Sequence, residues 1–81
     1  MKLEDLRKQI DELDAKIVKL IAERIKIVED IGKEKEKRGR QIEDTQREKR
    51  VLENVRRVAR QENVSQENID SIYRQIVTVS R

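Results

Sequence analysis

The sequence predicts an all-α protein with three helices, one long and two short, that pairs with a second copy of itself. Apolar residues recur at steps of three and four over most of the chain, which is the period of an amphipathic helix. No segment has the alternating pattern of a strand, and no proline interrupts the helical pattern. The length of 81 residues is enough for one domain, which we expect to span residues 1–81.

The first predicted helix covers about residues 3–37. We define its seam as the apolar residues with coiled-coil spacing: Leu3, Leu6, Ile10, Leu13, Ile17, Leu20, Ile27 and Ile31. Further apolar residues make the stripe wider than a two-helix contact requires: Val18, Ile21, Ile25 and Val28. Gly32 is a weak helix former, but we interpret the whole stretch as one long helix.

Two shorter helices follow a connection at about 38–43, where the helical period breaks and the second glycine stands. The second helix covers about 45–61, and Thr45 forms a capping box with the glutamate three residues later. The third helix covers about 66–80, after Ser65, a residue type favoured at helix starts.

The helix lengths indicate a homodimer. At 1.5 Å per residue, the first helix is roughly 50 Å long and each short helix roughly 22 Å. The short helices therefore leave part of the seam uncovered, and a domain of this size is usually marginal on its own. A second copy of the chain would cover the remaining apolar surface.

The composition excludes several functional classes. Without Cys or His, the chain has no zinc finger, disulfide, thiol nucleophile or imidazole base. No apolar run approaches the ~18–20 residues of a membrane span, so we expect a cytoplasmic protein without a membrane partner. Residues 33–40 have a net charge of +3, which equals the net charge of the whole chain. Tyr73 is the one aromatic residue. Nucleic-acid surfaces are usually broader and richer in aromatics, so we expect no nucleic-acid partner.

Arg24 and Lys35 occupy positions where the seam would continue with Leu or Ile. They are eleven residues apart, three turns plus ~20°, and therefore share a face about 16 Å apart. An unpaired buried cation costs several kcal/mol, so each needs an opposite charge. Two explanations stay open from the residues alone: a register-setting ion pair, or a site for an anionic ligand.

Arg7 flanks the seam 17 residues before Arg24, roughly 25 Å away along one helix. One small ligand could not touch both within a chain, but in an antiparallel pair Arg7 of the partner could lie beside Arg24. Taken alone, Arg7 is simply a surface residue. In the same way, Ser80 falls on the apolar side of the last helix and, taken alone, is part of a frayed helix end.

The start of the second helix contains a charge that capping does not explain. Asp44 and Glu48 suit a helix start because acidic groups complement the helix dipole there. Arg47 does not, since a cation is unfavourable in the first turn.

Two segments now indicate a family: LRKQIDELDAKIVKLIAERIKIVEDIGKEK and the later IEDTQREKRVLENV. Over about residues 3–80, the sequence resembles the all-α class of chorismate mutases. The resemblance implies three helices in an intertwined homodimeric bundle, with two active sites that contain residues of both chains. It also implies an isomerase of aromatic amino-acid biosynthesis, the shikimate pathway, that needs no cofactor and no metal.

The resemblance further implies how individual residues act. Arg24 would bind one carboxylate of chorismate, and Arg7 of the partner would bind the other. Lys35 would reach the enol-ether oxygen and a neighbouring carboxylate. Glu48 and the backbone near Asp44 would bind the ring hydroxyl. The implied catalytic set is therefore Lys35, Arg24 and Glu48.

The remaining implied site residues shape the pocket. Arg47 would form part of its wall, and Ser80 would lie near a substrate carboxylate. The apolar walls would be Ile31, Val51 and Val77.

The chain also departs from the family pattern. The family usually has a Gln or Glu about one turn beyond the position of Ser80, as a second donor to the ether oxygen, and the printed sequence ends at Arg81. Arg81 itself stands where a small apolar residue is usual. A truncated sequence, a dispensable last turn and impaired activity all stay open. The lack of Pro, Phe and Trp also leaves an engineered origin open.

Two alternative functions remain from the sequence. An isochorismate-pyruvate lyase would use the same fold and a similar cationic pocket. A helical coiled-coil interaction module without activity would use the seam alone, but it would not explain Arg24 and Lys35 on the apolar face.

Overall fold

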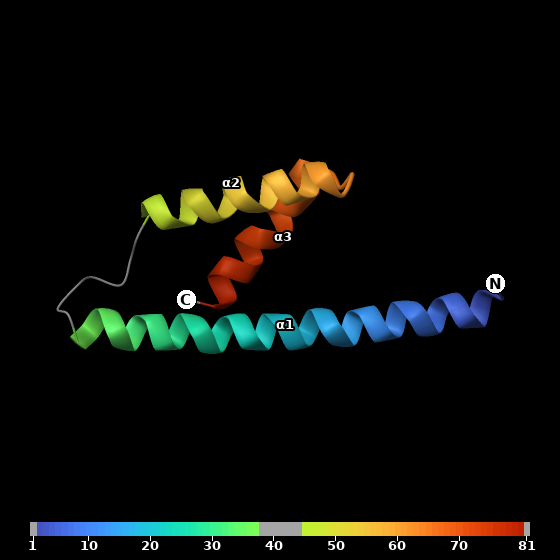
Figure 1. Cartoon of the computed structure of the whole chain (residues 1–81), viewed down its shortest axis with the longest axis horizontal. Coiled ribbons are helices and arrows are strands. Elements are labelled where there is room, and N and C mark those ends of the chain that lie inside the picture. The colour runs from blue at the N-terminus through green and yellow to red at the C-terminus, as the bar shows by residue number, and fades with distance from the viewer. Residues whose placement is uncertain (1, 38–44, 81) are drawn as a thin grey trace.

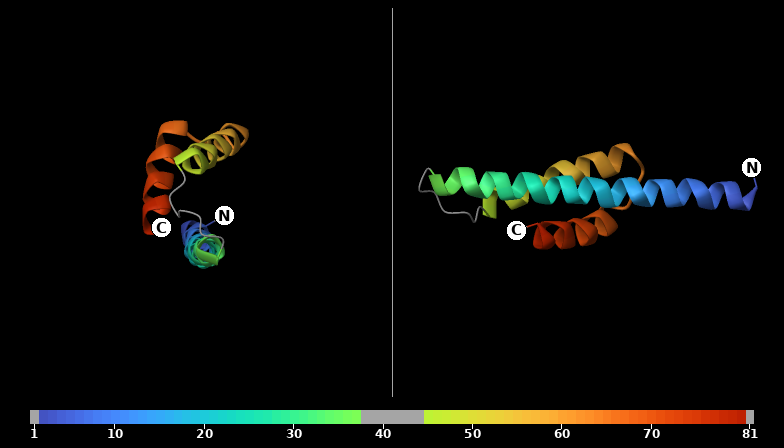
Figure 2. Two further views of the ribbon diagram at one scale, coloured as in Figure 1. Left: turned by 90° about the vertical axis from the view of Figure 1, so that its left-hand side faces the viewer. Right: turned by 90° about the horizontal axis from the view of Figure 1, so that it is seen from below.

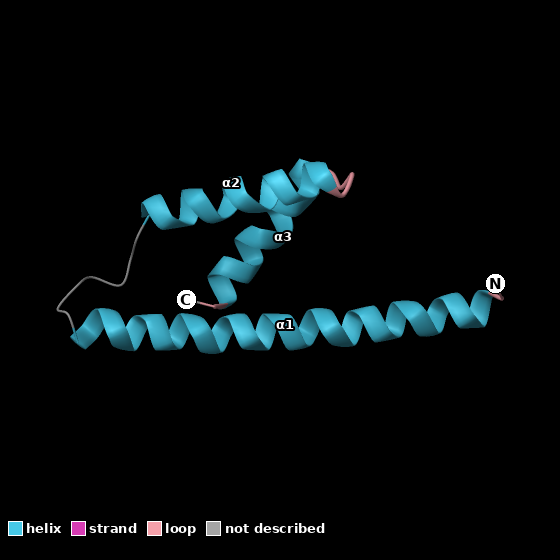
Figure 3. Ribbon diagram, viewed as in Figure 1, coloured by secondary structure: helices cyan, strands magenta, loops and turns pink. Residues whose placement is uncertain are grey.

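The structure, a computed structural model, describes residues 2–37 and 45–80. It contains three helices, α1 (Leu3–Lys37), α2 (Thr45–Gln61) and α3 (Gln66–Val79), and these two ranges contain no strand (Figure 1 and Figure 3). The predicted all-α class with one long and two short helices is thereby confirmed. The predicted connection at 38–43 and the predictions for Asp44 and Arg81 lie outside the described residues.

The two short helices pack against each other, while α1 makes fewer contacts with them. In Figure 1, α3 runs from the far end of α2 towards the middle of α1, and the N-terminal part of α1 extends past both. In the left view of Figure 2, along the axis of α1, this helix lies beside the pair rather than between its members. The radius of gyration is 16.0 Å, and the chain measures 56 × 23 × 17 Å. A compact chain of this length would have a radius of gyration of about 12 Å, so the single chain is open and elongated.

The seam of α1 is uncovered in the single chain. Its eight side chains are 43–62% exposed, and α1 has no fully buried residue. Among the residues that the structure describes, Ala59 of α2 is the only buried apolar side chain, with 3% of it exposed. A continuous apolar stripe of this kind is typical of a surface that binds another protein. The packing within one chain therefore leaves the main apolar surface of α1 without a partner in that chain.

The end of α2 is fixed by its backbone. The N–H of Val64 donates to the carbonyl of Ala59 at 2.8 Å, and the N–H of Asn63 donates to the carbonyl of Arg60 at 3.4 Å. These two bonds form a Schellman motif, which closes a helix with one left-handed residue. That residue is Asn63, with a φ of 57°, and asparagine is one of the few residue types that tolerate this conformation. The chain therefore turns directly from α2 into α3.

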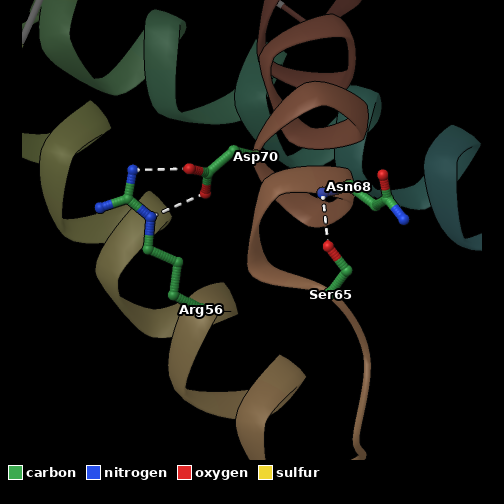
Figure 4. Close-up of polar contacts among 4 residues, drawn as sticks. All are labelled: Arg56, Ser65, Asn68 and Asp70. Atoms are coloured by element: carbon green, nitrogen blue, oxygen red, sulfur yellow. Dashed lines mark hydrogen bonds and ion pairs between the residues drawn. The ribbon is translucent and has the colours of Figure 1, made fainter.

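Two side-chain contacts fix how α3 begins and how it packs (Figure 4). The Oγ of Ser65 accepts a hydrogen bond from the N–H of Asn68 at 3.3 Å, which confirms the predicted N-cap. Further along, both oxygens of Asp70 accept from the guanidinium of Arg56 on α2, at 2.7 and 2.8 Å. This bidentate pair joins α2 to α3 at a partly exposed position, with 38% and 20% of the two side chains accessible.

We expect the pair to make stability fall in acid. Hydrogen bonds from Arg56 lower the pKa of Asp70, and the positive charges of Arg56 and Arg74 add to this effect. A depressed folded pKa contributes stability above the unfolded pKa of about 4, and this is lost as the pH falls through the folded pKa. The urea concentration at the midpoint of unfolding should therefore fall more between pH 7 and pH 3 for the wild type than for Asp70→Asn. The control Glu62→Gln, in the exposed turn after α2, should follow the wild type. Equal losses for wild type and Asp70→Asn would contradict this prediction.

Candidate active site

The partly buried side chains of α1 lie on one face of its C-terminal half. Their positions follow the period of a helix: Ile21, Arg24, Ile25, Val28, Gly32 and Lys35. We call this set the half-buried face. All other described side chains of α1 are more exposed than these. The half-buried face therefore includes both cations that interrupt the seam pattern, Arg24 and Lys35.

Arg24 contacts the end of α3. Its Nη1 donates a hydrogen bond to the Oγ of Ser80, which lies 56 positions later in the sequence. Ser80 is only 4% exposed, and it is the C-cap of α3. Its N–H donates to the carbonyl oxygen of Ile76 at 3.1 Å, and its hydroxyl donates to the same oxygen at 2.6 Å. The structure thus brings two predicted site residues together, and the interpretation of Ser80 as part of a frayed helix end does not hold.

Lys35 and the first turn of α2 provide the other charged groups of the candidate site. Lys35 and Glu48 are partly buried, whereas Arg47 is exposed. Each of the three takes part in a polar or electrostatic interaction, so none is a free charge. Figure 1 shows the start of α2 on the side of the C-terminal half of α1. A ligand at this end would therefore meet groups of both signs.

Arg7 does not join this group within one chain. It is exposed on the N-terminal part of α1, roughly 25 Å from Arg24 along the helix. That part of α1 extends beyond α2 and α3 (Figure 1). Asp44 lies outside the described residues. A site that needs Arg7 beside Arg24 therefore requires a second chain.

The half-buried face has open space at Gly32, one turn before Lys35. A Cβ placed on Gly32 would meet no atom within 4 Å. Of the three predicted apolar walls, Val51 and Val77 are partly buried, while Ile31 is 48% exposed on the seam side of α1. In the single chain, the α1 surface at Gly32 is therefore open.

The chemistry of this set favours binding an anion. A guanidinium presents a planar fork of donors that matches a carboxylate, and an ammonium acts as a point charge. The sequence contains no Cys or His, so neither a thiol nucleophile nor an imidazole base is present. Sequence reasoning missed the carbonyl of Ile76, which accepts the Ser80 proton. The available signal was the spacing, because serine hydroxyls in helices often donate to the carbonyl four residues earlier.

None of the helices in the described part of the chain combines the length and apolar character needed to cross a membrane.

Comparison with known proteins gives a consistent result. The family model for chorismate mutase type II matches residues 6–81. A chorismate mutase of Methanocaldococcus jannaschii is 44% identical over 68 residues, which cover 84% of this chain and 68% of the relative. The T-protein of Haemophilus influenzae is 33% identical over 78 residues, which are 96% of this chain and 21% of that protein.

A bifunctional chorismate mutase/prephenate dehydratase of Aquifex aeolicus is 34% identical over 79 residues, or 94% of this chain. The matched region is only 22% of the Aquifex protein. This chain thus spans about two thirds of the Methanocaldococcus relative and about a fifth of the other two. No solved structure is significantly similar to it.

Proposed function

Because this chain belongs to the chorismate mutase type II family, we propose that it catalyses the rearrangement of chorismate to prephenate in aromatic amino-acid biosynthesis. The observation that carries the proposal is the placement of Arg24 and Lys35 on the half-buried face of α1, beside apolar residues and open space. Chorismate is a small dianion, so its charge matches these two cations. The proposal also keeps the cytoplasmic location that the sequence predicts.

The proposed reaction suits the composition. It is an intramolecular [3,3] rearrangement, in which one C–O bond breaks while one C–C bond forms. It requires neither a nucleophile nor an obligatory proton transfer. The protein must hold the flexible substrate in a compact conformation with the reacting carbons aligned, and two cations that clamp two carboxylates can do this. Negative charge grows on the ether oxygen in the transition state, and a fixed cation there lowers the barrier.

The proposed roles follow the family pattern. Arg24 binds one carboxylate, and Lys35 donates to the ether oxygen and to a neighbouring carboxylate. Glu48 binds the ring hydroxyl together with the backbone near Asp44, while Arg47 walls the pocket. The partial burial of Arg24, Lys35 and Glu48 supports these roles, because charges in such surroundings are less screened than exposed ones.

We propose that the working unit is a homodimer in which each site takes Arg7 from the partner chain. Three features of the single chain support this: the exposed seam, the N-terminal part of α1 that extends beyond the other helices, and the distance of Arg7 from Arg24. Antiparallel pairing of two α1 helices would cover both seams. It would also place each Arg7 next to the Arg24 of the other chain.

The direct test is the absorbance of chorismate in the presence of micromolar protein. We expect the absorbance to fall at a rate proportional to enzyme concentration, with prephenate as the product. The same chain extended by two helical turns ending in Gln tests the effect of the second donor to the ether oxygen. Pyruvate formed from isochorismate, with chorismate unchanged, would favour the lyase. If neither the given chain nor the extended chain converts chorismate or isochorismate, although both form dimers, the result would favour the interaction module.

A further inference from the structure

We propose that the exposed outer side of α2 binds the N-terminal part of α1 in another copy of this chain. The contact joins the proposed homodimers into larger assemblies. It uses charged surfaces that belong neither to the candidate active site nor to the exposed seam. The contact does not depend on catalysis, and its tests need no substrate.

The α2 helix has a net charge of +4, compared with +3 for the whole chain, because its 17 residues include six basic and two acidic side chains. The exposed side of the helix presents four cations around one acidic residue: Lys49, Arg50, Glu53, Arg57 and Arg60. We call this set the basic face. Its centre lies roughly 170° around the helix from the partly buried Val55, so it takes no part in the packing of α2. Within the described part of the chain, none of its four cations forms an ion pair.

The N-terminal part of α1 has the opposite charge. Residues 3–14 include five acidic and two basic side chains, a net charge of −3. On the side of the helix away from the seam, four exposed acidic residues surround one exposed lysine: Glu4, Asp5, Lys8, Asp11 and Glu12. We call this set the acidic face. It belongs to the part of α1 that extends beyond α2 and α3, so these helices leave it uncovered within one chain (Figure 1).

The charges of the two faces match in spacing. Four residues of the acidic face each have a residue of opposite charge 45 positions later: Glu4 and Lys49, Asp5 and Arg50, Lys8 and Glu53, and Glu12 and Arg57. Two helices that lie side by side in the same direction therefore match in charge along the contact, with Lys8 opposite Glu53. A shift by one turn in either direction would place Lys8 beside another cation, Lys49 or Arg57. The pattern therefore favours one register.

The occupant of the basic face is another copy because the two faces are held apart within one chain. If two α1 helices pair along their seams, both acidic faces stay on the outside of the dimer. Each exposed ion pair is weak, so several must form together. A dimer offers both faces twice, and two dimers can therefore join through repeated contacts.

The first measurement is sedimentation velocity of the wild type at two salt concentrations. Salt screens exposed charges beyond roughly 30 Å at about 0.01 M and beyond roughly 3 Å at about 1 M. We expect species larger than the high-salt form at low salt, with a dissociation constant that rises more than about tenfold at high salt. This measurement does not depend on whether a variant folds. The same size at both salt concentrations would overturn the proposal.

The second measurement reverses charges on one face at a time. The α2 variant carries Lys49→Glu and Arg57→Glu, and the α1 variant carries Glu4→Lys and Glu12→Lys. We expect neither variant to form the larger species at low salt, because each now presents like charges on its two faces. An equal mixture should form them again, because each altered face meets its opposite in the other variant.

The control variant carries Lys26→Glu and Lys33→Glu. It has the same net charge as the α2 variant, but both changes lie at exposed positions of α1 outside the two faces. We expect it to form the larger species as the wild type does. Loss in the control equal to that in the α2 variant would show an effect of net charge alone and overturn the proposal. Larger species that persist in both face variants, with helices confirmed by circular dichroism, would also overturn it, as would a face variant that breaks up the high-salt form itself.

Discussion

Replacement of Lys35 by alanine should lower kcat for the conversion of chorismate by about 10²–10³, the usual loss when one donor to a developing negative charge is removed. Lys35 lies on the half-buried face of α1, one turn beyond the open position at Gly32. Its ammonium group would meet the ether oxygen, where charge increases between the ground state and the transition state. The loss should therefore appear mainly in kcat, measured by chorismate absorbance.

Lys33→Ala is the matched control for this experiment. Lys33 has the same charge and lies two residues earlier on α1, but its side chain is exposed on another face. We expect it to retain activity within about twofold, as surface substitutions usually change little. Circular dichroism and sedimentation should show that Lys35→Ala keeps its helices and its oligomeric state. An unchanged rate in Lys35→Ala, or loss of folding in that variant, would remove Lys35 from its proposed catalytic role.

Mixing two inactive variants should restore activity if the sites are shared between chains. Arg24→Ala and Arg7→Ala should each lose about 10²–10³ in kcat/KM, because each lacks one carboxylate ligand. After the two are unfolded and refolded together in equal amounts, half of the dimers contain one chain of each kind. Each mixed dimer has one site with both arginines, so the mixture should recover about a quarter of the wild-type specific activity.

The mixture of Arg24→Ala with Lys35→Ala is the control for this complementation. Both residues belong to the same chain's contribution to a site, so every site in a mixed dimer lacks one of them. This mixture should stay inactive under the refolding conditions that restore the first. If Arg7→Ala and Arg24→Ala also fail to complement although mixed dimers form, Arg7 is not shared across the two chains.

The features that the sequence predicted correctly are those set by neighbouring residues. The period of the apolar residues in α1 follows from helix geometry, and Ser65 caps α3 through a bond to a residue only three positions away. Arg24 could be selected because it interrupts the seam. The family resemblance then supplied roles for the site residues that the period alone could not.

The features that were not predicted depend on how helices cross. The contact between Arg24 and Ser80 joins residues 56 positions apart, and the pair of Arg56 and Asp70 needs the particular packing of α3 on α2. Neither has a local sequence signal. Ile31 belongs to the seam and is 48% exposed in the single chain, so its place in the pocket wall stays a prediction. Small rotations about a helix axis decide which of two adjacent faces a residue joins.

The exposed stripe on α1 also affects how this protein can evolve. If two copies meet along it, one codon change alters the assembly at two places related by the symmetry axis. A substitution that removes a methyl group there removes it from both copies at the interface, and a stabilising substitution also acts in both copies. Selection on these leucines and isoleucines should therefore be steeper than on apolar residues that contact only their own chain.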